Sequence, residues 1–203
     1  MVEEIRALEK NGTWEVMSLP RGKKPVGCKW VFTVKYKADG TVERYKARLV
    51  AEGFTQTYGI DYTKTFAPMA KLNTIRDLLS LAANLDWALH QFDINNVFLN
   101  GELEEEVFIT LPPGFCKEEE ETGVCKLKKS LYDLKQSPRA WFDRFAKVIK
   151  NQGYEQEQSD HTMFFKQSND GRMTILIVYV DDIILIGDNT GEVERLKKVQ
   201  SLR

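Results

Sequence analysis

The chain has few of the residues that build disulfide frameworks, zinc sites or histidine-dependent active sites. Its 203 residues include three cysteines, Cys28, Cys116 and Cys125, and two histidines, His90 and His161. An odd number of widely spaced cysteines argues against a disulfide framework and against a zinc site, and it is typical of a reducing compartment. Two isolated histidines support neither a Ser-His-Asp nor a Cys-His arrangement.

The sequence also lacks a membrane-length apolar run, and residues 1–15 are too acidic for a signal peptide. We therefore expect an intracellular protein with no membrane partner. Neither G-x-x-x-x-G-K-[ST] nor G-x-G-x-x-G occurs, which argues against P-loop and Rossmann nucleotide binding. The formal net charge is -1, so a nucleic-acid surface would require local segregation of charge.

Hydrophobic periodicity predicts a mixed α+β protein, long enough for one large domain or two small ones. Asn73 is the expected N-cap of its second helix. We expect helices over 3–10, 73–85, 139–151 and 191–202, and strands over 29–37, 41–50, 87–94, 162–166, 173–180 and 183–187.

Positive charge is concentrated in one predicted hairpin, whose turn is Asp39-Gly40. Residues 21–50 contain nine Lys or Arg residues against two acids. Along the first strand Trp30, Phe32, Val34 and Tyr36 fall on one face and lysines on the other, while the return strand places Arg44, Lys46 and Arg48 on a single face. This pattern fits a solvated hairpin or a cationic ribbon that faces phosphates.

Two adjacent acids, Asp181 and Asp182, interrupt an apolar, β-branched stretch over 174–186 that is typical of buried strands. Two like charges in a nearly buried place are unfavourable unless a cation compensates them, and carboxylate oxygens suit Mg²⁺. The alternative is a solvated hairpin tip with two surface acids.

Asp93 ends another apolar strand. A lone acid there is most often a cap or turn former. If Asp93 lies beside the 181–182 hairpin in one sheet, however, the three acids could hold two divalent ions in the geometry of in-line phosphoryl transfer.

Together these segments resemble the reverse transcriptase of Ty1/copia-type retrotransposons. Tyr179-Val-Asp-Asp182 is similar to the family's Y-x-D-D box. The other matching blocks follow in order along nearly the whole chain: Asn11-Gly-Thr-Trp-Glu15, Gly27-Cys-Lys-Trp-Val-Phe32, Tyr45-Lys-Ala-Arg-Leu-Val50, Gly53-Phe-Thr-Gln56, Thr65-Phe-Ala-Pro68, Phe98-Leu-Asn-Gly101, Pro112-Pro-Gly-Phe115 and Leu134-Lys-Gln-Ser-Pro-Arg-Ala-Trp141.

The resemblance implies an RNA-directed DNA polymerase with fingers over about 1–70 and 101–136, and a palm with a ferredoxin-like antiparallel sheet over about 71–100 and 137–203. It also implies a template–primer, a dNTP and two Mg²⁺ ions, with Mn²⁺ as an alternative, in a cytoplasmic particle. The residues to which it assigns roles are Asp93, Asp181 and Asp182 for metal and catalysis, Lys46, Arg48, Phe98 and Tyr179 for the nucleotide, and Lys135, Gln136 and Arg139 near the template.

Two departures bear on activity. Asp133 and Glu52 stand where the family usually has Gly and a basic residue. The chain ends about twenty residues after the Asp-Asp pair, where the family continues with a thumb and an RNase H domain, so we expect little or no processive polymerase activity from the isolated chain. The other functions considered are an inactive remnant that at most binds nucleic acid, and a two-metal nuclease.

Overall fold

The computed structural model describes residues 2–94, 99, 101–115 and 123–201, with the backbone alone over 197–201. The chain forms two compact units. Unit 1 comprises Met1–Phe66 and Phe98–Trp141, and unit 2 comprises Ala67–Val97 and Phe142–Arg203. Helices and antiparallel sheets are both present, as expected for an α+β protein. No helix of the described residues is long and apolar enough to cross a membrane.

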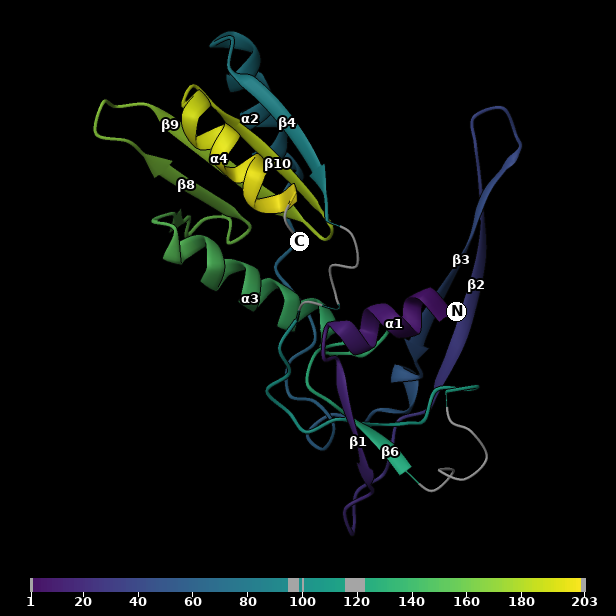
Figure 1. Cartoon of the computed structure of the whole chain (residues 1–203). Coiled ribbons are helices and arrows are strands. Elements are labelled where there is room, and N and C mark those ends of the chain that lie inside the picture. Colours follow the sequence, from purple (N-terminus) through teal and green to yellow (C-terminus); the bar gives the residue numbers. More distant parts are fainter. Residues whose placement is uncertain (1, 95–98, 100, 116–122, 202–203) are drawn as a thin grey trace. The chain divides into compact units, whose positions relative to one another are not determined.

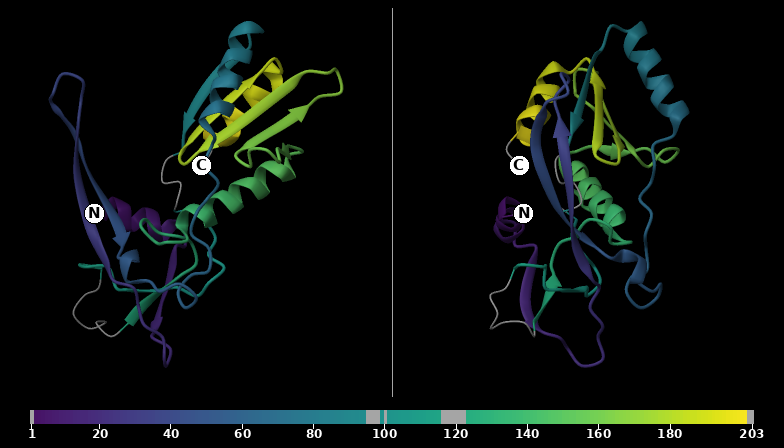
Figure 2. Two further views of the ribbon diagram at one scale, coloured as in Figure 1. Left: turned by 180° about the vertical axis from the view of Figure 1, so that it is seen from behind. Right: turned by 90° about the vertical axis from the view of Figure 1, so that its right-hand side faces the viewer.

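Unit 1 contains a long two-stranded hairpin, β2 (Cys28–Tyr36) and β3 (Val42–Ala51). Figures 1 and 2 show it as an extended ribbon with helix α1 (Val2–Lys10) beside β3. A second sheet has the order β1 (Trp14–Ser18), β6 (Gly123–Leu127), β5 (Phe108–Thr110). The core of the unit is built from Leu8, Leu49, Ile109, Leu131 and other buried apolar side chains.

Unit 2 is built on one five-stranded antiparallel sheet, in the order β4 (Ala88–Asp93), β10 (Asp182–Gly187), β9 (Met173–Tyr179), β8 (Met163–Gln167), β7 (Glu155–Gln156). β-Branched and aromatic side chains fill these strands, as their propensity predicts. The strands expected over 87–94, 162–166, 173–180 and 183–187 are confirmed within two residues at each end.

Helices cover both faces of this sheet, which is why its central strands are buried (Figure 1). On one face Leu78 and Ala82 of α2 (Leu72–Asn84) pack with Ile175, Ile177 and Ile186. On the other face Phe142 and Phe145 of α3 (Ser137–Asn151), which begins in unit 1, contact the ring of Phe164.

The start of α2 differs from the prediction. Its N-cap is Lys71, which has no side-chain capping bond, so the expectation of Asn73 was wrong. The helix start is fixed from outside instead, because the Asp160 carboxylate accepts the Lys71 N–H at 3.0 Å.

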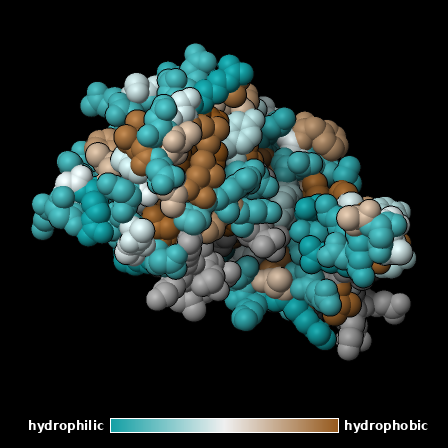
Figure 3. All heavy atoms as spheres, turned by 90° about the horizontal axis from the view of Figure 1, so that it is seen from above, coloured by the Kyte–Doolittle hydropathy of each residue, from teal (hydrophilic) through white to brown (hydrophobic). Residues whose placement is uncertain are grey.

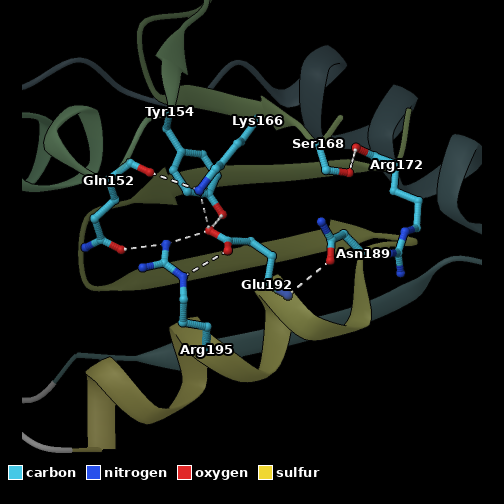
Figure 4. Close-up of polar contacts among 8 residues, drawn as sticks. All are labelled: Gln152, Tyr154, Lys166, Ser168, Arg172, Asn189, Glu192 and Arg195. Carbon is cyan, nitrogen blue, oxygen red and sulfur yellow. Dashed lines mark hydrogen bonds and ion pairs between the residues drawn. The ribbon is translucent and has the colours of Figure 1, made fainter. Parts of the chain in front are cut away.

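Helix α4 (Thr190–Ser201) is attached to the sheet by a polar cluster around Glu192 (Figure 4). The Glu192 carboxylate accepts bonds from Lys166 of β8 and from the Tyr154 hydroxyl, and it pairs with Arg195 one turn later. Bonds from Arg195 and Lys166 lower the pKa of Glu192 despite its burial. Burial and the adjacent Glu192 carboxylate raise the pKa of Tyr154.

The helices do not remove all apolar area from solvent. Figure 3, a view from above, shows brown apolar side chains among teal hydrophilic ones. The exposed leucines of α2, of the segment that follows it and of β4 are Leu72, Leu79, Leu81, Leu85 and Leu89.

Candidate active site

The two strands that carry the predicted catalytic acids are neighbours in the sheet of unit 2. Asp93, the last residue of β4, lies directly opposite Asp182, the first residue of β10. The pairing extends one residue further, because the Ile94 N–H donates to the Asp181 carbonyl at 2.9 Å. Asp93 precedes Asp181 by 88 positions in the sequence. The fold nevertheless brings all three acids to one end of one sheet.

A tight turn sets the position of Asp181. Tyr179 pairs with Asp182, so Val180 and Asp181 alone connect β9 to β10. Val180 has φ +57°, a conformation that is unfavourable for a β-branched residue. Backbone strain of this kind persists where the flanking structure fixes it, here two paired strands. The turn carries Asp181 to the tip of the hairpin, next to Tyr179, whose side chain is 42% exposed.

The acids are less buried than the sequence suggested. Asp93 and Asp181 are exposed, and Asp182 is half-buried. The expectation of a nearly buried Asp-Asp pair was therefore wrong, because the pair lies at the sheet end rather than between the buried stretches. Among the described residues, one side-chain donor bonds to Asp182.

That donor is Gln91, which the sequence did not single out. Its side-chain amide donates to Oδ1 of Asp182 at 3.0 Å. Gln91 precedes Asp93 by two residues on β4, so the period of a strand places both side chains on one face. This alternation was readable in the sequence, but the partner across the sheet was not.

The donor set suits a hard divalent cation, since all three candidate ligands are carboxylates. Among the described residues, however, no group of three or more His, Cys, Asp or Glu side chains is close enough together to hold a metal ion. The backbone register therefore places the acids together, whereas their side chains are not gathered around a common point.

The β2–β3 hairpin of unit 1 has two chemically different faces. Strand alternation and the pairing of Thr33 with Lys46 and of Val34 with Tyr45 define them. One face is cationic and carries Lys29, Lys35, Arg44, Lys46 and Arg48. The other is apolar and aromatic and carries Trp30, Phe32, Val34, Tyr36 and Tyr45, of which Phe32, Tyr36 and Tyr45 are exposed.

The two predicted nucleotide-binding cations lie at the half-buried part of the cationic face. The Arg48 guanidinium stacks over the Tyr132 ring at 5.7 Å, a cation–π contact. Burial, followed by the nearby charges of Arg48 and Arg44, lowers the pKa of the Lys46 ammonium. Burial also raises the pKa of Glu4 on α1, although Lys46 and Arg48 oppose the shift. An anion would be favoured beside these cations.

The predicted template segment lies where α3 begins. Lys135 is exposed and Arg139 is half-buried. Gln136 is buried and bonded at both ends of its amide. The Ser137 hydroxyl donates to the Leu131 carbonyl at 2.6 Å, which fixes the turn before the helix. Phe98 lies outside the described residues.

Comparisons with known proteins agree on one family. The family model described as "Reverse transcriptase (RNA-dependent DNA polymerase)" matches residues 11–202. The chain is 45% identical over 197 residues to the "Retrovirus-related Pol polyprotein from transposon TNT 1-94" of Nicotiana tabacum, covering 97% of this chain and 15% of that protein.

Two further relatives extend this likeness. The chain is 42% identical over 190 residues to the Pol polyprotein from transposon RE1 of Arabidopsis thaliana, covering 93% of this chain and 13% of that protein. It is 30% identical over 203 residues to the "Transposon Ty1-DR4 Gag-Pol polyprotein" of Saccharomyces cerevisiae, covering 96% and 12%. The chain therefore spans a small part of the relatives that it matches.

Proposed function

Because the chain belongs to the reverse transcriptase (RNA-dependent DNA polymerase) family, as a domain of a copia-type retrotransposon Pol polyprotein, we propose that it catalyses RNA-directed DNA synthesis. The reaction is nucleotidyl transfer from a dNTP to a primer 3′-hydroxyl. The observation that carries this proposal is the register of Asp93 with Asp182, with Asp181 at the adjoining turn. Unit 2 would serve as the palm and unit 1 as the fingers.

Asp93, Asp181 and Asp182 would hold two divalent ions, Mg²⁺ or Mn²⁺. Bound there, such ions would lower the pKa of the 3′-hydroxyl and offset the charge of the triphosphate. The exposure of Asp93 and Asp181 leaves both carboxylates accessible to ions and substrate. The strained Val180 turn and the Gln91 bond restrict where Asp181 and Asp182 lie.

The cationic face of the β2–β3 hairpin supports triphosphate binding. Lys46 and Arg48 would contact the phosphates, because two adjacent half-buried cations favour an anion there. As the family resemblance implies, we assign Phe98 to the sugar of the incoming nucleotide and Tyr179 to the nucleotide-binding site. We assign Lys135, Gln136 and Arg139 to the vicinity of the template.

A primer-extension assay that measures addition of the first nucleotides tests the proposal, because little processive synthesis is expected of the isolated chain. The chain is incubated with a primed homopolymeric RNA, the complementary dNTP, and Mg²⁺ or Mn²⁺. We expect Asp93→Asn and Asp181→Asn each to reduce extension by at least 10²-fold, since each removes a charge that the metals require. Binding of Mn²⁺, followed by its electron paramagnetic resonance signal, should weaken in parallel.

The matched control is Asp86→Asn. Asp86 is an exposed acid near the other end of β4, and Asn tolerates its φ of +53°. This variant should extend primers like the unaltered chain. Undiminished extension in Asp181→Asn would contradict the proposal, and cleavage of the RNA in place of extension would favour a nuclease.

A further inference from the structure

Two buried glutamines in unit 1 form a chain of amide hydrogen bonds. Gln56 follows the short helix η1 (Gly53–Thr55), and Gln136 immediately precedes α3. Their exposed fractions are 7% and 3%. A buried amide must find partners for its donor and its acceptor, so such a pair is retained only where the surroundings supply them.

The bonds of this chain all run in one direction. The backbone N–H of Lys135 donates to Oε1 of Gln56 at 2.9 Å. Nε2 of Gln56 donates to Oε1 of Gln136 at 3.1 Å. Nε2 of Gln136 then donates to the Asp61 carbonyl at 3.1 Å. The Lys135 N–H and the Asp61 carbonyl, a donor and an acceptor that cannot exchange roles, fix the orientation of both amides.

The backbone around Gln56 approaches the same segment closely. The Ala51 N–H donates to the Tyr132 carbonyl at 2.9 Å. At Gly53 an added Cβ would lie 2.0 Å from the carbonyl oxygen of Asp133, so only glycine allows this approach. Backbone and side-chain hydrogen bonds therefore both join residues 51–56 to residues 132–136.

We propose that Gln56 is a positioning residue for the segment 134–136. The role of that segment in catalysis rests on the proposed polymerase function. Gln56 is itself too buried to contact substrate. It holds the Lys135 backbone, and thereby the base of an exposed lysine side chain, and it sets which end of the Gln136 amide points toward Asp61. A nucleotide or template would then meet the exposed Lys135 side chain on a backbone held in one fixed position.

Two variants separate the bonds that Gln56 makes. Gln56→Glu keeps an acceptor for the Lys135 N–H but loses the donor to Gln136. Gln56→Leu loses both. Thr55→Val is the matched control, because Thr55 lies in the same turn and its hydroxyl bonds only to the Glu52 carbonyl among the bonds described.

The first readout is amide hydrogen exchange at Lys135, which needs no activity. We expect exchange to accelerate at least tenfold in Gln56→Leu and to stay slow in Gln56→Glu and Thr55→Val. The Ala51 amide, bonded to Tyr132, should remain protected in all three and reports that the unit is folded. Unchanged Lys135 exchange in Gln56→Leu would overturn the proposal.

The second readout is steady-state primer extension. Both Gln56 variants should raise KM for the dNTP about tenfold with kcat changed less than threefold, while Thr55→Val leaves both unchanged. Equal losses of kcat in all three variants would show that Gln56 only supports the fold and does not position the segment 134–136. Failure of the unaltered chain to add even a first nucleotide would contradict the polymerase function, whereas the exchange result decides separately whether Gln56 holds the segment.

Discussion

The Gln91 side chain donates a hydrogen bond of 3.0 Å to Oδ1 of Asp182 across two neighbouring strands of the sheet in unit 2. Asp182 is half-buried, whereas Asp93 and Asp181 are exposed. A charge-assisted bond of this kind contributes about 1.5–3 kcal/mol when both partners are ordered, and less at an exposed site. Gln91 therefore restricts the orientation of a proposed metal ligand.

Replacing Gln91 by Leu should lower kcat of primer extension about tenfold, the equivalent of roughly 1.4 kcal/mol. KM for the dNTP should change little, because Gln91 bonds to a proposed metal ligand and carries no charge of its own to hold the triphosphate. Steady-state extension checks this expectation. Gln167→Leu, on β8 of the same sheet, is the control and should behave like the unaltered chain. A kcat equal to that of the control would show that the bond has no role.

The two faces of the β2–β3 hairpin should contribute differently to RNA binding. Tyr45 is 81% exposed on the aromatic face, where a ring can stack on an unpaired base, and such stacking is worth about 1–3 kcal/mol. Tyr45→Ala should therefore weaken single-stranded RNA binding without changing its salt dependence. Fluorescence anisotropy at several salt concentrations measures both quantities.

The cationic face should instead determine how RNA binding depends on salt. Lys35 is exposed beside Arg44, and neutralising one phosphate contact changes the slope of log K against log salt by about 0.7 for a single strand. Lys35→Ala should reduce that slope, whereas Tyr45→Ala should not. If both variants had the same slope of log K against log salt, the two faces of the hairpin would not have separate roles in RNA binding.

The sequence sufficed for elements whose pattern is local. The alternation of Trp30, Phe32, Val34 and Tyr36 predicted β2, and the apolar runs on either side of Asp181-Asp182 predicted β9 and β10. The small sheet of β1, β5 and β6 was not predicted. Its strands have three to five residues, and β1 pairs with a strand more than a hundred positions away. The three residues of β5 are too few to show a period, and a five-residue strand shows one only weakly.

The candidate site divides in the same way. The three acids were recognised from residue type and order, but the register between β4 and β10 is a property of the folded sheet. Gln91, Gln56 and the strained turn at Val180 acquire their roles only from partners distant in sequence or from the backbone conformation. Residue identity alone could not indicate them.

Asp133 occupies a position that favours glycine. Its φ is +65°, and its side chain is exposed. Aspartate tolerates this conformation better than most residues, so the backbone cost is modest. We expect thermal stability to follow the order Asp133→Gly, then the unaltered chain, then Asp133→Ala, with steps of about 0.5–1 kcal/mol. Thermal unfolding followed by circular dichroism measures the order.

The same variants test whether Asp133 limits activity. If its negative charge repels the nucleotide or template, Asp133→Gly and Asp133→Ala should both extend primers faster than the unaltered chain. If only backbone strain matters, Gly should improve extension and Ala should reduce it. Equal extension by all three would show that this departure from the family pattern is without consequence.

Asp160 makes the stability of unit 2 depend on pH. The residue is 3% exposed, and it accepts bonds from the Lys71 N–H and from the N–H and hydroxyl of Thr162. Burial raises the pKa of the carboxyl, but these bonds outweigh it and the net pKa is lowered. The folded state thus binds the proton more weakly than the unfolded chain, whose Asp pKa is about 3.9.

The stabilisation is therefore complete above about pH 4 and is lost as the pH falls through the lowered pKa of the folded state. Asp160→Asn should reduce the free energy of unfolding by about 1–3 kcal/mol at pH 7, because the three donors would then have only one neutral acceptor oxygen. Near pH 2.5 the difference should shrink. Urea unfolding at both values measures it.

Asp170→Asn is the control for this prediction. Its carboxylate pairs with Arg172, and the resulting bonds lower the pKa of Asp170. Both side chains are about half exposed, so water and salt screen the pair and little stability depends on it. We expect Asp170→Asn to unfold close to the unaltered chain at either pH. An equal loss in both variants, or a loss in Asp160→Asn that does not depend on pH, would show that the charge of Asp160 does not hold the start of α2.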